Sequence, residues 1–284
     1  MTEQTNALIH PNLHALIYGM SGSRKSTLAA SFPKKMLVLA FDLWDNVKPY
    51  LRQGVEHYRA DLYDGPDEAR KKTAAYYQAI KVPCTDVRDE KGELLVRIEH
   101  YYNPNPKQYD AYMRFEARMA AFTQNPALLA PWRTVVLDSL TFLQSAVVGF
   151  ERTIQNPGKN NRLNNFGEGR SHLEDTIFCR LGSLDSNVII IGHEQVKEIK
   201  SKAGSLGALR GVASMGDLST ALPGGFGEVY HVTMEEDEEA NLVSKVRTRP
   251  HLDEYGEKWF AKSQENVPDR CEPTYEALWQ RESV

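Results

Sequence analysis

A lysine and a serine stand near the start of the chain, at the end of the Gly- and Ser-containing run Gly19-Met20-Ser21-Gly22-Ser23-Arg24-Lys25-Ser26-Thr27. The apolar run Leu13–Tyr18 comes directly before it. A strand, a glycine-rich turn and a helix start favour phosphate binding, because backbone N–H groups and a helix N-terminus converge on the anion. We expect Lys25 to reach the β- and γ-phosphates of a nucleotide and the Ser26 hydroxyl to ligate Mg²⁺. A strand-to-helix turn that binds nothing is the alternative.

One position departs from the phosphate-loop pattern G-x-x-x-x-G-K-[ST]. Arg24 stands where the pattern has its second glycine, and glycine serves there because the backbone needs permissive dihedrals close to the phosphate. We expect Arg24 to strain the loop or displace the nucleotide, although its guanidinium can pair with phosphate oxygens. The candidate binding residues are those of the loop: Gly19, Ser21, Gly22, Ser23, Arg24, Lys25, Ser26 and Thr27.

Acidic residues follow two further apolar runs. Thr134–Leu137 ends in Asp138, the pattern of a Walker B strand whose carboxylate holds Mg²⁺ through water. Met36–Phe41 ends in Asp42, with Asp45 shortly after it. Either aspartate can orient water or Mg²⁺ at the carboxyl edge of a sheet, or can cap a turn.

Basic residues complete the list of candidates. His193 ends the apolar run Val188–Ile191 after Gly192, and we expect it to sense the γ-phosphate from the same sheet edge, a structural histidine being the alternative. Strand alternation places Lys245, Arg247 and Arg249 on one face. Arg247 or Arg249 is then an arginine finger inserted in trans into a neighbouring subunit's site, or this is an exposed strand face.

The apolar runs imply an α/β fold with a largely parallel central sheet, formed by one domain over residues 1–284. We expect a peripheral insertion at about 55–107, with a helix over Asp67–Ile80, a hairpin turn at Asp89–Glu93 and a strand over Leu94–Tyr102. A helix is expected over Tyr109–Gln124. A C-terminal extension at about 250–284 is expected to pack back on the core through Trp259, Tyr275 and Trp279.

Two polar stretches are predicted to be loops. Gln155–Arg170 is rich in Asn, and Glu194–Glu228 is rich in Gly, Ser and Ala. Long loops in a compact domain are often functional. The second stretch carries Lys197, Lys200, Lys202 and Arg210, so single-stranded DNA or a neighbouring subunit is its expected partner.

Composition sets limits on function. With 41% hydrophobic and 25% charged residues, the chain is typical of globular proteins. Its net charge of −4 argues against a uniformly basic nucleic-acid binder. Three widely spaced cysteines lack metal-ligand spacing. No run is long and apolar enough for a membrane span, so we expect a cytoplasmic protein without a membrane partner.

The motifs together resemble a family of phage-encoded P-loop ATPases of the RecA-like class, near the phage annealing and recombination ATPases. The resemblance rests on the loop 16–27, on Phe41-Asp42 with Lys48–Arg52, and on Val135–Thr141. It continues through Asn187–His193, Leu222–Gly224 and Arg247–Pro250. Lys245-Val246-Arg247 is similar to the K-x-R finger of ring-shaped RecA-like helicases.

The resemblance implies ATP and Mg²⁺ as cofactors, single-stranded DNA as a partner, a ring or filament with sites at subunit interfaces, and the host cytoplasm as location. No clear glutamate follows the second strand, where Trp44-Asp45 stands. The first hypothesis is an ATPase that acts on DNA in phage recombination, annealing or replication. The second is a nucleotide-binding assembly protein in which Arg24 prevents efficient turnover.

Overall fold

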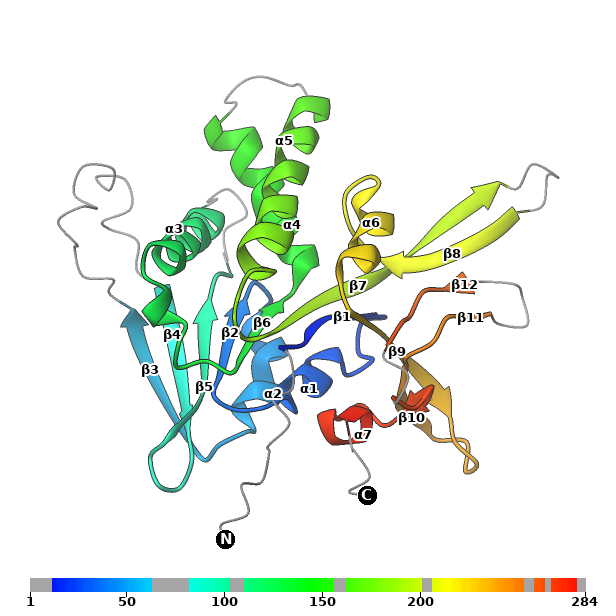
Figure 1. The fold of residues 1–284 in the computed structure, drawn as a ribbon, viewed down its shortest axis with the longest axis horizontal. Coiled ribbons are helices and arrows are strands. Elements are labelled where there is room, and N and C mark those ends of the chain that lie inside the picture. Colours follow the sequence, from blue (N-terminus) through cyan, green and yellow to red (C-terminus); the bar gives the residue numbers. More distant parts are fainter. Residues whose placement is uncertain are drawn as a thin grey trace, which may run out of the picture.

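The structure is a computed structural model that describes residues 12–62, 82–102, 110–155, 162–200, 206–252, 258–263 and 267–279. Within these residues, ten strands lie side by side in the order β13-β10-β9-β1-β7-β6-β2-β5-β4-β3 (Figure 1). Their bounds, in chain order, are β1 His14–Gly19, β2 Met36–Ala40, β3 Glu56–Leu62, β4 Val82–Arg88, β5 Leu94–His100, β6 Thr134–Asp138, β7 Asn187–Lys200, β9 Glu228–Glu236, β10 Leu242–Arg247 and β13 Arg270–Cys271. Strands β9, β1, β7, β6, β2 and β5 run parallel to their neighbours in this group, which gives the predicted α/β fold with a largely parallel sheet.

Helices cover both faces of this sheet (Figure 1). On one face lie α1 (Lys25–Ala30), α2 (Lys48–Leu51) and α7 (Tyr275–Trp279), with α3 (Asp110–Gln124), α4 (Leu140–Phe150) and α5 (Arg162–Glu174) on the other. Short helical turns complete these segments: η1 (Trp44–Val47), η3 (Pro126–Leu128), and the π-helical turns η4 (Glu151–Gln155) and η5 (Asp175–Leu181).

The alternation of side chains along each strand divides the core into two clusters. On β1, Ile17 packs with Leu28 of α1, while Leu16 packs with the cluster that includes Phe115 of α3 and Leu143 of α4. All these side chains are fully buried, and burial of each such side chain stabilises the fold by roughly 1.5–3 kcal/mol. A strand apolar on both faces can be covered only by two helical layers, which is why continuous apolar runs predicted this architecture.

The predicted loop over Glu194–Glu228 is wrong. Strand β7 continues through this region to Lys200, and β8 (Leu206–Val212) returns antiparallel to it, followed by α6 (Leu218–Gly225). The β7–β8 hairpin projects from the sheet (Figure 1), and β8 also pairs with β12 (Lys258–Trp259), which pairs with β11 (His251–Leu252). The glycine-rich composition of this region did not predict strand β8, because cross-strand pairing, rather than local propensity, stabilises β8.

The other irregular regions agree with prediction in part: the hairpin turn at Asp89–Glu93 is present, and the strand predicted after it is β5. The Asn-rich stretch Gln155–Arg170 is not a loop throughout, since α5 begins at Arg162. Region 55–107 supplies β3, β4 and β5, which extend the central sheet at one edge. The helix expected over Asp67–Ile80 lies outside the described residues, as does Lys202.

The C-terminal segment packs on the core as predicted. Tyr275 and Trp279 contact the cluster that holds α1, and the rings of Phe32 and Tyr275 lie 5.0 Å apart. Trp259 stacks on His251 at 4.8 Å. In the described part of the chain, no helix has the length and apolar character to cross a membrane.

Candidate nucleotide site

The glycine-rich loop joins β1 to α1 at the carboxyl edge of the sheet. Gly19, the last residue of β1, lies between His193 of β7 and Val232 of β9. A Cβ atom on Gly19 would lie 2.2 Å from the carbonyl oxygen of Val232. Glycine is therefore required at position 19 by the close approach of two backbones.

Arg24 takes the backbone conformation that glycine would take. Its φ and ψ are 70° and 27°, which is the left-handed helical region. A non-glycine residue pays roughly 1–2 kcal/mol for this conformation. Of the two consequences expected of Arg24, strain is thus visible in the backbone.

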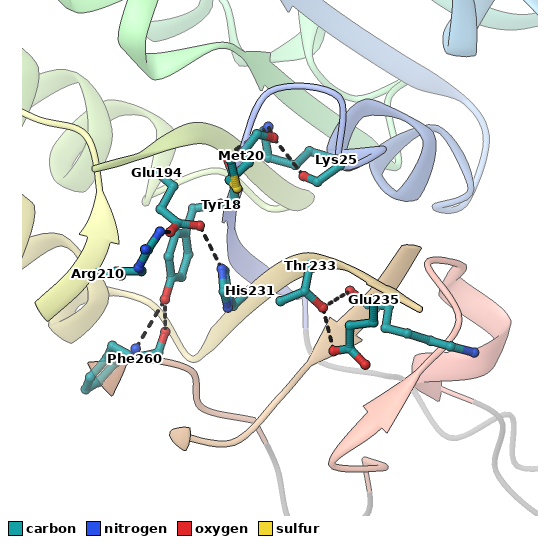
Figure 2. Close-up of polar contacts among 12 residues, drawn as sticks. Tyr18, Met20, Lys25, Glu194, Arg210, His231, Thr233, Glu235 and Phe260 are labelled. Carbon is teal, nitrogen blue, oxygen red and sulfur yellow. Dashed lines mark hydrogen bonds and ion pairs between the residues drawn. The ribbon is translucent and has the colours of Figure 1, made fainter. Parts of the chain in front are cut away.

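Lys25 folds back over its own loop. Its ammonium donates to the carbonyl oxygens of Met20 at 2.6 Å and Gly19 at 3.1 Å (Figure 2). Burial lowers the pKa of Lys25 to about 8, opposed by the negative charges of Asp138, Asp42 and Glu194. These carboxylates lie close enough to favour the charged ammonium, which is the form that binds phosphate.

Asp138, at the end of β6, joins the loop to the rest of the sheet edge. Its Oδ2 accepts hydrogen bonds from Ser26 Oγ and from Tyr50 Oη, both at 2.7 Å. Burial raises the pKa of Asp138 to about 6, and the two hydroxyl donors oppose that rise. The structure thus brings together the two predicted metal-side residues, which lie 112 positions apart in the chain.

These donors and acceptors fit a magnesium nucleotide. The Ser26 hydroxyl proton points to Asp138, so the lone pairs of the Ser26 oxygen can face a cation. Lys25 uses two of its three N–H groups on loop carbonyls, which leaves one for a phosphate oxygen. A Cβ on Gly22 would meet no atom within 4 Å, so the outer side of the loop is open. Hydroxyl, carboxylate and ammonium groups are the set that Mg²⁺ and phosphate require.

His193 lies beside this group, at the point where β7 leaves the central sheet. Its backbone N–H donates to Thr141 Oγ1 at 3.2 Å, and its ring packs edge-on against Phe142. Burial lowers the pKa of His193, the Lys25 charge lowers it further, and Asp42 opposes both. His193 is therefore a neutral imidazole at neutral pH, within electrostatic reach of Lys25.

The two aspartates after β2 have different surroundings. Asp42 is buried, and its Oδ1 accepts from the Leu43 amide and from Asn46 Nδ2 at 2.8 and 2.7 Å. Asp45 is exposed and forms an ion pair with Lys48. Asp42 therefore caps the turn before α2, and its charge also acts on Lys25.

The predicted finger residues lie at the end of β10, which pairs with β9, and just after it. Arg247 forms an ion pair with Glu235 at 2.9 Å, and Arg249 forms one with Asp269 at 3.3 Å. Lys245 pairs with Glu272. Lys245 and Arg247 alternate along β10, whereas Arg249 lies two residues beyond the end of that strand. All three cations have acidic partners from the same chain.

Sequence reasoning missed three residues of this region: Tyr50, Ser244 and Glu194. Ser244 of β10 is buried and donates to the Ser23 carbonyl oxygen of the loop at 2.6 Å. A serine at an inward position of an alternating strand was the available signal. Tyr50 has no such signal, because its partner is 88 positions away.

Glu194 anchors a network next to the loop (Figure 2). Its carboxylate accepts from Arg210 of β8 and from His231 of β9, each at 2.9 Å. Burial raises the pKa of Glu194, but these two donors more than offset it, so the net pKa lies below its usual value. Tyr18 stacks on His231 and donates to the Phe260 carbonyl oxygen. Glu194 thus links β7 to β8 and to β9, and Tyr18 links β1 to β9 and to the C-terminal segment.

Comparison with known proteins identifies the family. A family model described as an AAA domain matches residues 11–264. No curated protein matches the chain. The matched range contains the loop, Asp138, His193 and the finger candidates. The chain therefore belongs to the AAA-domain family of nucleotide-binding P-loop ATPases.

Proposed function

We propose that the protein is a Mg²⁺-dependent ATPase that acts on single-stranded DNA in phage recombination, annealing or replication, as a homo-oligomer. The observation that carries the ATPase assignment is the contact between the Ser26 hydroxyl and Asp138 beside the Lys25 ammonium. Lys25, Ser26 and Asp138 together place a phosphate-binding helix start beside a carboxylate that can bind a metal ion. A turn with a purely structural role does not require this combination of groups.

In the proposed reaction, water attacks the γ-phosphorus, the bond to the β–γ bridging oxygen breaks, and ADP, inorganic phosphate and a proton released to solvent form. Lys25 would hold the β- and γ-phosphates, Ser26 and Asp138 would hold the cation, and His193 would sense the γ-phosphate. The bound Mg²⁺ supplies charge neutralisation on the phosphate oxygens. Arg247 or Arg249 from a neighbouring subunit completes the site.

The DNA partner is supported by the motif order that resembles phage recombination ATPases and by the projecting β7–β8 hairpin. Lys197 and Lys200 lie in the outer part of β7. Arg210 is held by Glu194 at the base of the hairpin, so its part is structural. Phosphate contacts make binding salt-dependent, and the Lys197→Ser/Lys200→Ser variant should therefore weaken DNA binding and flatten its salt dependence.

The test is ATP turnover with and without single-stranded DNA, in the native chain, in Lys25→Ala and in Arg24→Gly. The proposal expects turnover in the native chain that DNA stimulates and Lys25→Ala abolishes. ATP turnover that single-stranded DNA does not change would support the ATPase assignment and contradict the assignment of DNA as a partner. Turnover that persists in Lys25→Ala would come from a contaminant and overturn the assignment.

The strained Arg24 favours a second candidate, an assembly protein that binds nucleotide with little turnover. This candidate predicts an oligomer that forms without hydrolysis and turnover that appears only in Arg24→Gly. Native turnover that Lys25→Ala abolishes would reject it.

A further inference from the structure

We propose that Tyr50 is a positioning residue for the metal site: its hydroxyl holds the Asp138 carboxylate in the orientation that Mg²⁺ binding requires. The inference rests on the proposed function, because it assumes that Ser26 and Asp138 hold the cation of a bound nucleotide.

The environment of Tyr50 makes its hydroxyl dependent on Asp138. Tyr50 lies in α2, is fully buried, and belongs to the apolar cluster that includes Val38, Ala40 and Leu28. A hydroxyl among apolar side chains is costly without a hydrogen-bond partner. Asp138 Oδ2, 2.7 Å away, accepts its proton, so the ring and the carboxylate are held in one arrangement.

The two hydroxyl donors together fix the carboxylate. Each carboxylate oxygen offers about two lone pairs, and Ser26 and Tyr50 occupy those of Oδ2. They approach from different elements, α1 and α2. One donor restrains Oδ2 along one direction, whereas two donors from separate helices restrain it along two.

The position of α2 also links the Tyr50–Asp138 hydrogen bond to the end of β2. Asp42 Oδ1 holds the turn that leads into α2 by accepting from Leu43 and Asn46. The Asp138 carbonyl oxygen in turn accepts from the Phe41 amide at 2.7 Å. The segment after β2 therefore both hydrogen-bonds to the end of β6 and leads into the helix that carries Tyr50. This placement leaves Tyr50 little room to turn away from Asp138.

The experiment measures metal binding apart from turnover. Tyr50→Phe removes the hydroxyl and keeps the ring. We expect ADP affinity without metal to stay within about twofold of the native value, since the loop is unchanged. Mn²⁺ affinity for the ADP complex, measured by electron paramagnetic resonance, should fall about 10-fold or more, the usual effect of losing a group that orients a metal ligand.

Tyr101→Phe is the matched control. Tyr101 is also fully buried and donates to a carboxylate, Glu99, at 2.6 Å. The Tyr101→Phe variant removes the same kind of bond in the other core cluster from the one that holds Tyr50. Mn²⁺ affinity should therefore stay at the native value even if the melting temperature falls.

The outcomes separate this inference from the proposed function. A native chain that binds neither ADP nor Mn²⁺·ADP overturns both. Native binding with equal Mn²⁺ affinity in Tyr50→Phe overturns the Tyr50 role alone, as does an equal loss in Tyr101→Phe. If Tyr50→Phe does not fold, a crystal structure of the native Mn²⁺·ADP complex decides: the Tyr50–Asp138 bond supports the role, and a Tyr50 hydroxyl turned away refutes it.

Discussion

At the scale of single residues, Arg24 takes a left-handed backbone conformation that glycine adopts at little cost. The left-handed conformation at φ 70° is maintained by the loop around it, including the two bonds that Lys25 makes to loop carbonyls. The free-energy cost of this conformation lowers the stability of the folded state. Replacing the Arg24 side chain can remove this cost.

Arg24→Gly should therefore raise the free energy of unfolding of the nucleotide-free protein by about 1 kcal/mol. Chemical denaturation measures this. Arg24→Ala is the control, because it removes the guanidinium and keeps the Cβ atom that causes the strain. An equal gain in Arg24→Ala would show that charge, and not backbone strain, is responsible.

At the scale of elements, β10 supports the phosphate loop from outside the parallel part of the sheet. Ser244→Ala removes the hydroxyl that donates to the Ser23 carbonyl oxygen, and a buried group without its partner costs about 1–3 kcal/mol. We expect a lower free energy of unfolding and weaker ADP binding, measured by denaturation and calorimetry.

Ser186→Ala is the matched control for Ser244→Ala. Ser186 is buried and donates to the Trp132 carbonyl oxygen at 2.8 Å. It directly precedes β7, at the sheet edge opposite to the one that carries the loop. The variant should lower stability and leave ADP affinity unchanged. Equal ADP affinity in Ser244→Ala and Ser186→Ala would mean that β10 does not support the loop.

Strand β5 gives a prediction of pH dependence. Burial, and secondarily the charge of Arg59, lowers the pKa of His100 from 6.5 to about 4. The folded protein thus prefers neutral His100, so stability is lost as pH falls from about 6.5 toward 4, where the unfolded chain binds the proton first. At pH 5 this loss is about 2 kcal/mol. Denaturation at pH 7 and pH 5 should show a smaller loss of unfolding free energy in His100→Gln than in the native chain. An equal loss in the two proteins would contradict the assignment of this pH dependence to His100.

The elements that sequence reasoning found and missed differ in the kind of signal they carry. Strands β1, β2, β6 and β7 have continuous apolar runs, and parallel strands end at a common edge. The sequence alone therefore predicts that Lys25, Asp138 and His193 lie together. Strand β8 and the start of α5 have glycine- or asparagine-rich sequences, and their partners stabilise them. Tyr50 and Glu194 depend on partners distant in sequence, which one chain without pairing information does not reveal.

At the scale of the whole molecule, the finger hypothesis can be tested by mixing subunits. If Arg247 acts in trans, Lys25→Ala and Arg247→Ala are each inactive, and an equal mixture that exchanges subunits recovers about a quarter of native turnover. ATP hydrolysis measures this recovery. No recovery from exchanging subunits would reject the trans role.

Arg270→Ala is the control for this experiment. Arg270 pairs with the same carboxylate, Glu235, as Arg247 does. Its loss disturbs that ion pair without removing the finger candidate, so turnover should be retained. Inactive Arg270→Ala would assign the effect of Arg247→Ala to the ion pair.

Strand β7 belongs to two structures at once. Its first half lies between β1 and β6, and its second half forms the hairpin with β8. From His193 to Lys200 it is one unbroken strand of about 23 Å, at roughly 3.3 Å per residue. Glu194, which accepts hydrogen bonds from Arg210 and His231, lies next to His193 at the start of this outer half. We expect a force on the outer end of the hairpin to reach the backbone beside the phosphate loop along this strand, and a change in the loop to reach the hairpin by the same route.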